Sequence, residues 1–170
     1  MSSSVTALGG QSFEGRVRVM DAGLQGMITL RIDVSDEAAV TALRAAGFEM
    51  PRQGQAHGGL SAGTLWMSPD EVLILCDYDA VGETIERLNA QLDGQHHLAA
   101  DVSDARCVLR LEGAAIALRE TLAKLTPADM RAETCPVGTL RRTRLAQVPA
   151  AIWFEDEETA IVVAFRSVAD

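Results

Sequence analysis

The side chains best suited to chemistry in this sequence are three cysteines and three histidines. A cysteine nucleophile requires a thiolate beside a base, and the pairing to consider is Cys135 with His57. Cys135 precedes Pro136, which indicates a turn, and nothing in the sequence brings His57 to it. Cys76 and Cys107 fall in apolar runs, where a reduced cysteine packs as a small hydrophobic residue. We therefore predict no catalytic residue in this chain.

Metal and phosphate binding also have candidate residues. His96 and His97 are adjacent, so on a strand they point to opposite faces and cannot hold one ion together. A glycine-rich stretch contains Gly54, Gly58 and Gly59. A phosphate loop needs a strand before it and a helix after it, and in this sequence that order is reversed. The carboxylates at 155–158 lack the spacing of a calcium loop. We predict neither a metal site nor a cofactor site.

Composition excludes several classes of protein. The chain has 170 residues, of which 48% are hydrophobic and 23% charged, and its formal net charge is −9. Such a chain folds as one domain or as two small fused modules, and its acidic balance opposes nucleic acid. No apolar run is long enough to cross a bilayer, and residues 1–15 lack the pattern of a secretory signal. We expect a cytoplasmic protein that binds neither membrane nor nucleic acid.

The first half of the chain predicts a strand, a helix, a hairpin and a second helix. The strand has alternating apolar residues at Ile28, Leu30 and Ile32. Ser35 is expected to cap the next helix, which Gly47 ends, and residues 47–63 are expected to be a loop or an extended segment. Two apolar runs around the turn at 69–70 indicate a hairpin. The second helix has apolar residues at helical spacing: Val81, Ile85, Leu88 and Leu92.

The second half repeats this plan. ITLRI (28–32) matches CVLRL (107–111), and LWMSPDEVLIL (65–75) matches IWFEDEETAIVV (152–163) with one inserted residue. After Gly113 a helix is predicted whose apolar residues are Ile116, Leu118, Leu122 and Leu125. Strand, helix, strand and strand is the order of a ferredoxin-like module. We predict an α+β fold of two fused ferredoxin-like (split β-α-β) modules with mixed or antiparallel sheets.

The predicted modules cover residues 26–103 and 104–170, after an N-terminal tail with an edge strand at 1–25. The second module lacks its last helix, since only RSVAD follows its final strand. An uncovered sheet face costs about 25 cal/mol per Å² of apolar surface left in water. We therefore expect that face to be a partner-binding surface or an oligomer interface. In the alternative, Met20, Leu24 and the N-terminal segment fold back to cover it.

Four phrases carry a family resemblance: DVSDARCVLRLEG (101–113), TPADM (126–130), CPVGTLRRTRL (135–145) and RSVAD (166–170). In them the chain resembles the gamma subunit family of heterotetrameric sarcosine oxidase. The resemblance implies a fold like the folate-binding domain of aminomethyltransferase. It also implies a small non-catalytic subunit of an oxidoreductase complex that demethylates sarcosine to glycine and transfers the one-carbon unit to tetrahydrofolate. FAD, FMN, NAD and tetrahydrofolate then belong to the larger subunits, which are the expected partners.

Two other functions stay open: a stand-alone folate-binding aminomethyltransferase-like protein, which the aromatic content of 4% disfavours, and a ferredoxin-like ligand sensor. A homo-oligomer of the isolated chain also stays open. For the assembly role, the expected interface residues are Arg131, Arg141, Arg142 and Arg144, because arginine is favoured at interfaces. Charge reversal at Arg142 is then expected to weaken assembly. The alternative is a solvated strand face.

Overall fold

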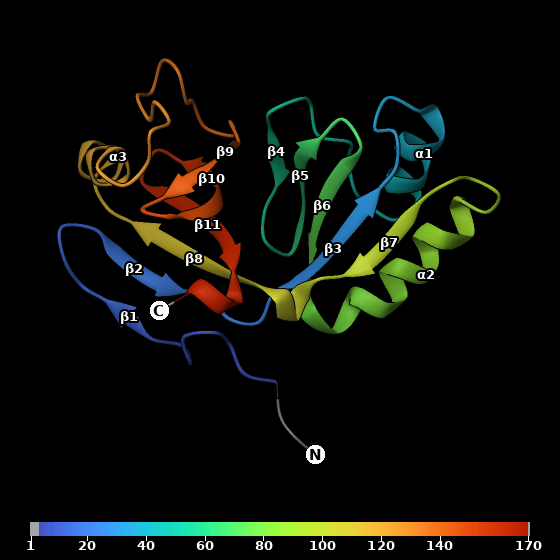
Figure 1. Cartoon of the computed structure of the whole chain (residues 1–170), viewed down its shortest axis with the longest axis horizontal. Helices are drawn as coiled ribbons and strands as arrows, with labels where there is room; N and C mark the ends of the chain where they lie inside the picture. The colour runs from blue at the N-terminus through green and yellow to red at the C-terminus, as the bar shows by residue number, and fades with distance from the viewer. Residues whose placement is uncertain (1–3, 170) are drawn as a thin grey trace. The chain divides into compact units, whose positions relative to one another are not determined.

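The computed structural model describes residues 4–169, which fall into two units (Figure 1). Unit 2 is continuous and covers Gln25–Asp104, whereas unit 1 combines the segment up to Leu24 with the chain from Ala105 onward. Each unit contains one sheet, and every strand pair in both sheets is antiparallel. The predicted α+β class with antiparallel sheets is confirmed.

Unit 2 has a five-stranded sheet with the order β4-β5-β6-β3-β7. Its strands are β3 (Gly26–Arg31), β4 (Ala56–Gly58), β5 (Ala62–Ser68), β6 (Glu71–Cys76) and β7 (Leu98–Asp101). Its helices are α1 (Glu37–Ala45), the 3-10 helix η1 (Tyr78–Ala80) and α2 (Val81–Gln91). The 3-10 helix η2 (Ser103–Ala105) spans the boundary between the two units. Apart from the additional strand β4 between α1 and β5, the chain order β3-α1-β5-β6-α2-β7 is that of a ferredoxin-like module.

The core of unit 2 follows from two periodicities. Ile28 and Leu30 alternate along β3 and are fully buried on the same face as Ile74 of β6. Leu43 of α1 and Leu88 of α2 pack against that face, so both helices lie on one side of the sheet (Figure 1). The strand and the second helix predicted from apolar spacing are therefore present.

One local prediction for unit 2, the residue that caps its first helix, is wrong. The N-cap of α1 is Asp36, whose side chain accepts the amide of Ala38 at 2.9 Å, and not Ser35. Ser35 instead donates its amide and its hydroxyl to Asp33, because a short polar side chain in a turn competes for nearby partners. The segment 47–63, predicted as a loop or an extended segment, contains the short extended strand β4, which pairs with β5.

Unit 1 has a six-stranded sheet with the order β1-β2-β8-β11-β10-β9. Its strands are β1 (Ser12–Phe13), β2 (Arg18–Asp21), β8 (Arg106–Glu112), β9 (Arg141–Leu145), β10 (Val148–Asp156) and β11 (Thr159–Phe165). Its helices are α3 (Ala115–Ala123) and the 3-10 helix η3 (Arg166–Val168). In the described residues no α-helix follows β11.

The internal repeat extends to the arrangement of the strands. The order β10-β11-β8-β2 in unit 1 corresponds to β5-β6-β3-β7 in unit 2. The hairpin β5-β6 has a register shift between Trp66 and Ser68, and β10-β11 has one between Phe154 and Asp156. The place of β7 is taken in unit 1 by β2, which comes from the other end of the chain. The N-terminal segment predicted at 1–25 thus supplies the fourth strand of the module.

The prediction of an uncovered apolar sheet face is wrong for β10 and β11. Ile161 and Val162 point to opposite faces of the sheet, and both are at most 1% exposed. On one face the cover includes α3 and the segment after it, through Leu118, Met130 and Cys135. In the N-terminal segment, Val17 is buried in this core. Leu24, which the alternative prediction expected to cover the face, is 41% exposed.

The buried face of the helix α3 also differs from the predicted one. Leu118 and Leu122 are fully buried, as expected, but Ile116 is 72% exposed and Leu125 lies beyond the helix and is 42% exposed. A helix as short as α3 presents only two turns to the sheet, so an apolar residue off that line stays in water. No helix in residues 4–169 is long and apolar enough to span a bilayer.

Candidate functional site

The four arginines predicted at an interface lie on two neighbouring stretches of unit 1. Arg141, Arg142 and Arg144 belong to β9, and Arg131 lies in the segment 124–140 that joins α3 to β9. Side chains alternate along a strand, so Arg142 and Arg144 share the exposed face while Arg141 is half-buried on the other. The guanidinium of Arg141 donates to the carbonyl of Thr134. The structure therefore brings together Arg142 and Arg144 but not all four residues.

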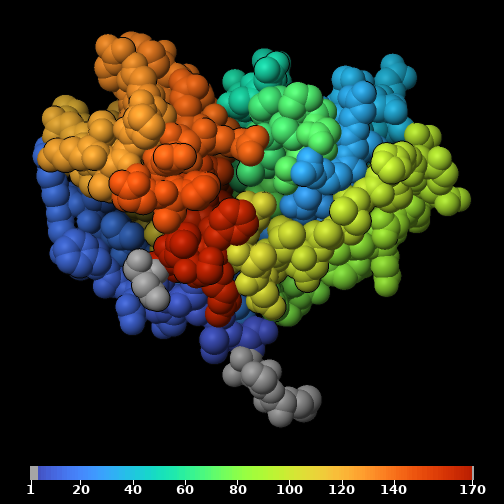
Figure 2. Space-filling view, viewed as in Figure 1, coloured from blue at the N-terminus to red at the C-terminus, as the bar shows by residue number. Residues whose placement is uncertain are grey.

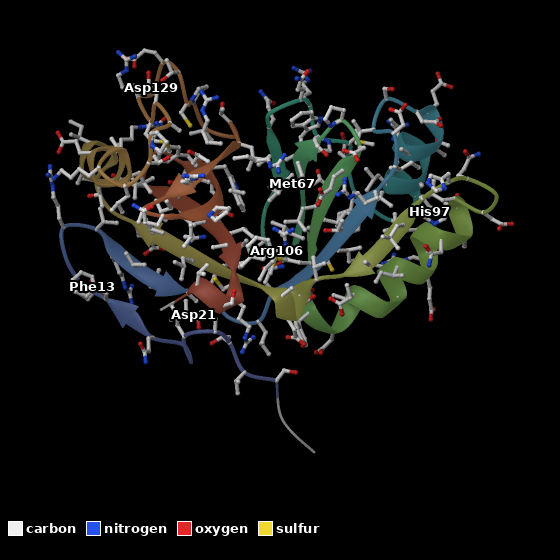
Figure 3. All side chains as sticks on the ribbon, viewed as in Figure 1. Phe13, Asp21, Met67, His97, Arg106 and Asp129 are labelled. Atoms are coloured by element: carbon white, nitrogen blue, oxygen red, sulfur yellow. The ribbon has the colours of Figure 1, made fainter. Side chains whose placement is uncertain are left out.

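Arg131 is a surface side chain with a carboxylate partner. Its Nη2 lies 2.5 Å from Oδ2 of Asp129, and its side chain is 75% exposed. Hydrogen bonds from the Arg131 guanidinium and amide hold the pKa of Asp129 well below its usual range. Asp129 lies at the tip of the segment 124–140 (Figure 3), which forms an orange lobe on the surface of unit 1 (Figure 2). An exposed ion pair of this kind contributes about 0–1 kcal/mol, so Arg131 stays a predicted interface residue.

The segment 124–140 is held by an arginine that sequence reasoning did not single out. Arg119 of α3 has an 11% exposed side chain, and its Nη1 donates to the carbonyls of Met130 and Cys135, both at 2.9 Å. Its guanidinium carbon lies 4.0 Å from the centre of the Phe154 ring. Arg119 lies in a helix of mixed apolar and polar residues, and no spacing pattern in the sequence distinguishes it from the other polar residues of that helix. Its role is to position the segment that leads into β9.

Three of the four carboxylates at 155–158 make contacts within unit 1. Glu155 Oε2 lies 2.6 Å from Nη1 of Arg110, and Asp156 accepts the amide of Glu158 at 2.8 Å. Glu157 pairs with Arg119 at 3.1 Å. The hydrogen bonds to Glu112 and Glu155 raise the pKa of Arg110, so this cation stays charged. Ion pairing and turn geometry account for the carboxylates of Glu155, Asp156 and Glu157.

The cysteines are all buried in the described residues. Cys76 belongs to unit 2, and Cys107 and Cys135 belong to unit 1; none is more than 7% exposed. Burial raises the pKa of all three thiols, because a thiolate is poorly solvated in an apolar surrounding. Protonated thiols of this kind are inert as nucleophiles. His57, the candidate base for Cys135, lies on β4 of unit 2.

This burial gives a first testable prediction. Ellman's reagent should label the native thiols at least about a hundredfold more slowly than those of the denatured chain, since reaction must wait for opening of the fold. In denaturant, three equivalents should react promptly, which is the internal control. Rapid labelling of any one thiol in the native protein would contradict the burial of that side chain.

His97 and the depression beside His57, both in unit 2, make no binding site that the contacts support. His97 contacts the carbonyl of Gln95 at 3.0 Å and the Asn89 side chain at 2.9 Å, near the turn between α2 and β7 (Figure 3). Among the described residues, no group of three or more His, Cys, Asp or Glu side chains is placed to hold a metal ion. The depression beside His57 has a volume of about 90 Å³, well below the size of typical ligand sites.

Comparison with known proteins identifies a family. The model of the sarcosine oxidase gamma subunit family matches residues 31–170. The sarcosine oxidase subunit gamma of Corynebacterium sp. (strain U-96) is 34% identical over 118 residues, and that of Arthrobacter sp. is 33% identical over 135 residues. These alignments cover 68% and 76% of this chain. They cover 55% and 64% of the relatives, so the chain spans less than two thirds of either.

Solved structures agree with this assignment. A chain of the heterotetrameric sarcosine oxidase from Corynebacterium sp. U-96, in complex with pyrrole 2-carboxylate, superposes with a TM-score of 0.79 at 26% identity. The superposition covers 92% of this chain and 80% of that one. Aminomethyltransferase T of the glycine cleavage system from Bartonella henselae has a TM-score of 0.62 at 13% identity, covering 88% and 42%, and shares the fold alone. The chain belongs to the sarcosine oxidase gamma subunit family.

Proposed function

We propose that this chain is a small assembly subunit of a cytoplasmic heterotetrameric sarcosine oxidase and contributes no catalytic residue of its own. The observation that carries the proposal is the superposition of 92% of the chain on a chain of such a heterotetramer. In this proposal the larger subunits hold FAD, FMN, NAD and tetrahydrofolate. They also carry out the demethylation of sarcosine and the transfer of the one-carbon unit.

Features of the described residues support a structural role. The thiols are buried, which raises their pKa, and Glu155 and Glu157 at the β10-β11 turn pair with Arg110 and Arg119. Catalysis needs convergent groups of matched pKa with room for a substrate. What unit 1 offers instead is an exposed basic strand, β9, in a chain whose formal charge is −9. Such a local reversal of charge suits a protein contact, because opposite potentials steer association.

Co-expression with the larger subunits of a sarcosine oxidase tests this function. We expect the chain to co-purify with them and to elute at the size of the complex. Charge reversal at Arg142 (Arg142→Glu) should weaken the affinity about tenfold, which is the usual size of an interfacial charge effect. Arg52→Glu makes the same change of charge on an exposed residue of unit 2 and should leave assembly unchanged.

The outcomes separate two questions. If the wild-type chain does not co-purify with the larger subunits, the proposed function is wrong. If the wild-type chain assembles and Arg142→Glu assembles equally well, the function stands and the side chain of Arg142 lies outside the contact. Circular dichroism of each variant verifies that the fold is kept.

A further inference from the structure

The outer strand β9 leaves a sheet edge available for pairing. Each sheet ends in two outer strands, and in the part of the chain that the structure describes these are β1, β9, β4 and β7. They contain two, five, three and four residues respectively, so β9 is the longest. An edge strand presents main-chain donors and acceptors that can pair with another strand.

Pro149 determines which residues of β9 present those groups. Arg144 lies opposite Pro149 in the antiparallel pair of β9 and β10. Opposite residues alternate between pairs that exchange two hydrogen bonds and pairs that exchange none. Proline has no N–H, so the pair Arg144 and Pro149 is of the second kind. The N–H and C=O of Arg144 therefore point away from β10, whereas those of Thr143 bind Ala150.

The inner face of β9 keeps the strand in position. The hydroxyls of Thr143 and Thr126 lie 2.9 Å apart, and Leu145 packs against the core of unit 1. The amide of Ala146 donates to the carbonyl of Leu125 at 2.7 Å. The edge is thus ordered before any partner arrives, which lowers the entropy lost on binding.

Charge decides what kind of strand this edge accepts. β9 has the sequence RRTRL, and Arg142 and Arg144 project from its exposed face. Two copies of β9 paired antiparallel about Thr143 would place Arg142 of each copy opposite Arg144 of the other. Like charges directly opposite each other destabilise a strand pair. Self-association through this edge is therefore disfavoured, and a strand with carboxylates at alternate positions is favoured.

We propose that the edge of β9 binds an extended acidic segment of a larger sarcosine oxidase subunit as an additional strand of the unit 1 sheet. The main chain of Arg144 forms the inter-strand hydrogen bonds. Carboxylates of the segment at positions two apart pair with Arg142 and Arg144. This mode of recognition takes its affinity from the main chain and its specificity from alternate side chains. The inference rests on the proposed function, which supplies the partner.

Hydrogen exchange in the co-expressed complex tests strand addition directly. The Arg144 amide should exchange at least about tenfold more slowly in the complex than in the isolated chain, because a new inter-strand bond protects it. The Thr143 amide is bonded to Ala150 in both states and is the internal reference. An unchanged Arg144 amide in a complex that does form would overturn strand addition.

A pair of variants separates the main chain from the side chain. Arg144→Ala removes the charge, whereas Arg144→Pro removes the charge and the outward N–H without breaking a bond to β10. We expect Arg144→Pro to assemble about tenfold more weakly than Arg144→Ala, the effect of roughly one lost hydrogen bond to a partner strand. Equal assembly of the two variants would also overturn the inference.

These tests are distinct from the test of function. If the wild-type chain does not bind the larger subunits, the proposed function fails. If it binds and the Arg144 amide is unprotected, only the strand addition fails, and the arginines then serve to repel other edges. Should Arg144→Pro unfold in isolation, the exchange measurement on the wild-type complex decides alone.

Discussion

Replacing Arg119 with alanine is expected to lower the free energy of unfolding of the chain by about 3 kcal/mol. The side chain is 11% exposed and donates to the carbonyls of Met130 and Cys135. Removing it leaves two acceptors of the segment 124–140 without their donor, and each costs about 1–3 kcal/mol where water cannot replace it. The contact with the Phe154 ring, at 4.0 Å, is lost as well.

Urea denaturation followed by circular dichroism measures this loss. Arg16→Ala is a matched control, because Arg16, like Arg119, forms an ion pair with a glutamate. Its Nη2 lies 2.6 Å from Glu120 of α3, but its side chain is 58% exposed. Exposed pairs contribute about 0–1 kcal/mol, so this variant should stay close to wild type. Arg119→Lys should restore only part of the stability, since an ammonium lacks the planar fork. Equal stability of Arg119→Ala and Arg16→Ala would refute the positioning role of Arg119.

Replacing Gly26 with alanine is expected to cost about 3 kcal/mol, at the upper end of the usual range for overpacking a buried site. A Cβ on Gly26, the first residue of β3, would lie 2.6 Å from the carbonyl oxygen of Asp77 and 2.8 Å from that of Cys76. These are backbone atoms and cannot turn aside. The neighbouring Gln25 also donates to the Cys76 carbonyl, at 2.6 Å, so a shift there disturbs a second contact.

Gly82→Ala is the matched control for this variant. Gly82 lies in the first turn of α2, where a Cβ meets no atom within 4 Å. Alanine is the better helix former, so this substitution should stabilise the chain by about 0.5–1 kcal/mol. The two glycine variants should therefore move the urea midpoint in opposite directions. A Gly26→Ala variant as stable as wild type would show that β3 and β6 can separate locally at no cost.

Elements within unit 2 were predictable because their signals are local. Ile28 and Leu30 alternate with period two, and Leu88 and Leu92 follow the period of a helix. Each pattern arises because one face of the strand or helix is buried, and it does not depend on which other element covers that face. The residue that caps a helix and the exact residues on its buried face were less predictable, because several neighbouring residues fit the same pattern. Ser35 was predicted as the cap in place of Asp36, and Ile116 was predicted on the buried face of α3.

The candidate interface was predictable only as a basic run. The sequence showed that Arg141, Arg142 and Arg144 are close together, and alternation then separates Arg141 from the other two. That β9 is an outer strand follows from the sheet order. The direction of the Arg144 main chain follows from its position opposite Pro149. Neither fact is contained in the spacing of residues 141–145.

By itself, the sequence determined two copies of one strand and helix plan, because the repeat and its apolar periods depend on neighbours a few residues apart. The tertiary structure alone decided that β2 takes the place in unit 1 that β7 has in unit 2, and that both faces of β11 are buried. Strand pairing joins residues far apart in the chain, as Val19 and Leu111 are. The sheet edge to which a strand such as β2 adds depends on the arrangement of the whole sheet, so a local sequence pattern does not predict it.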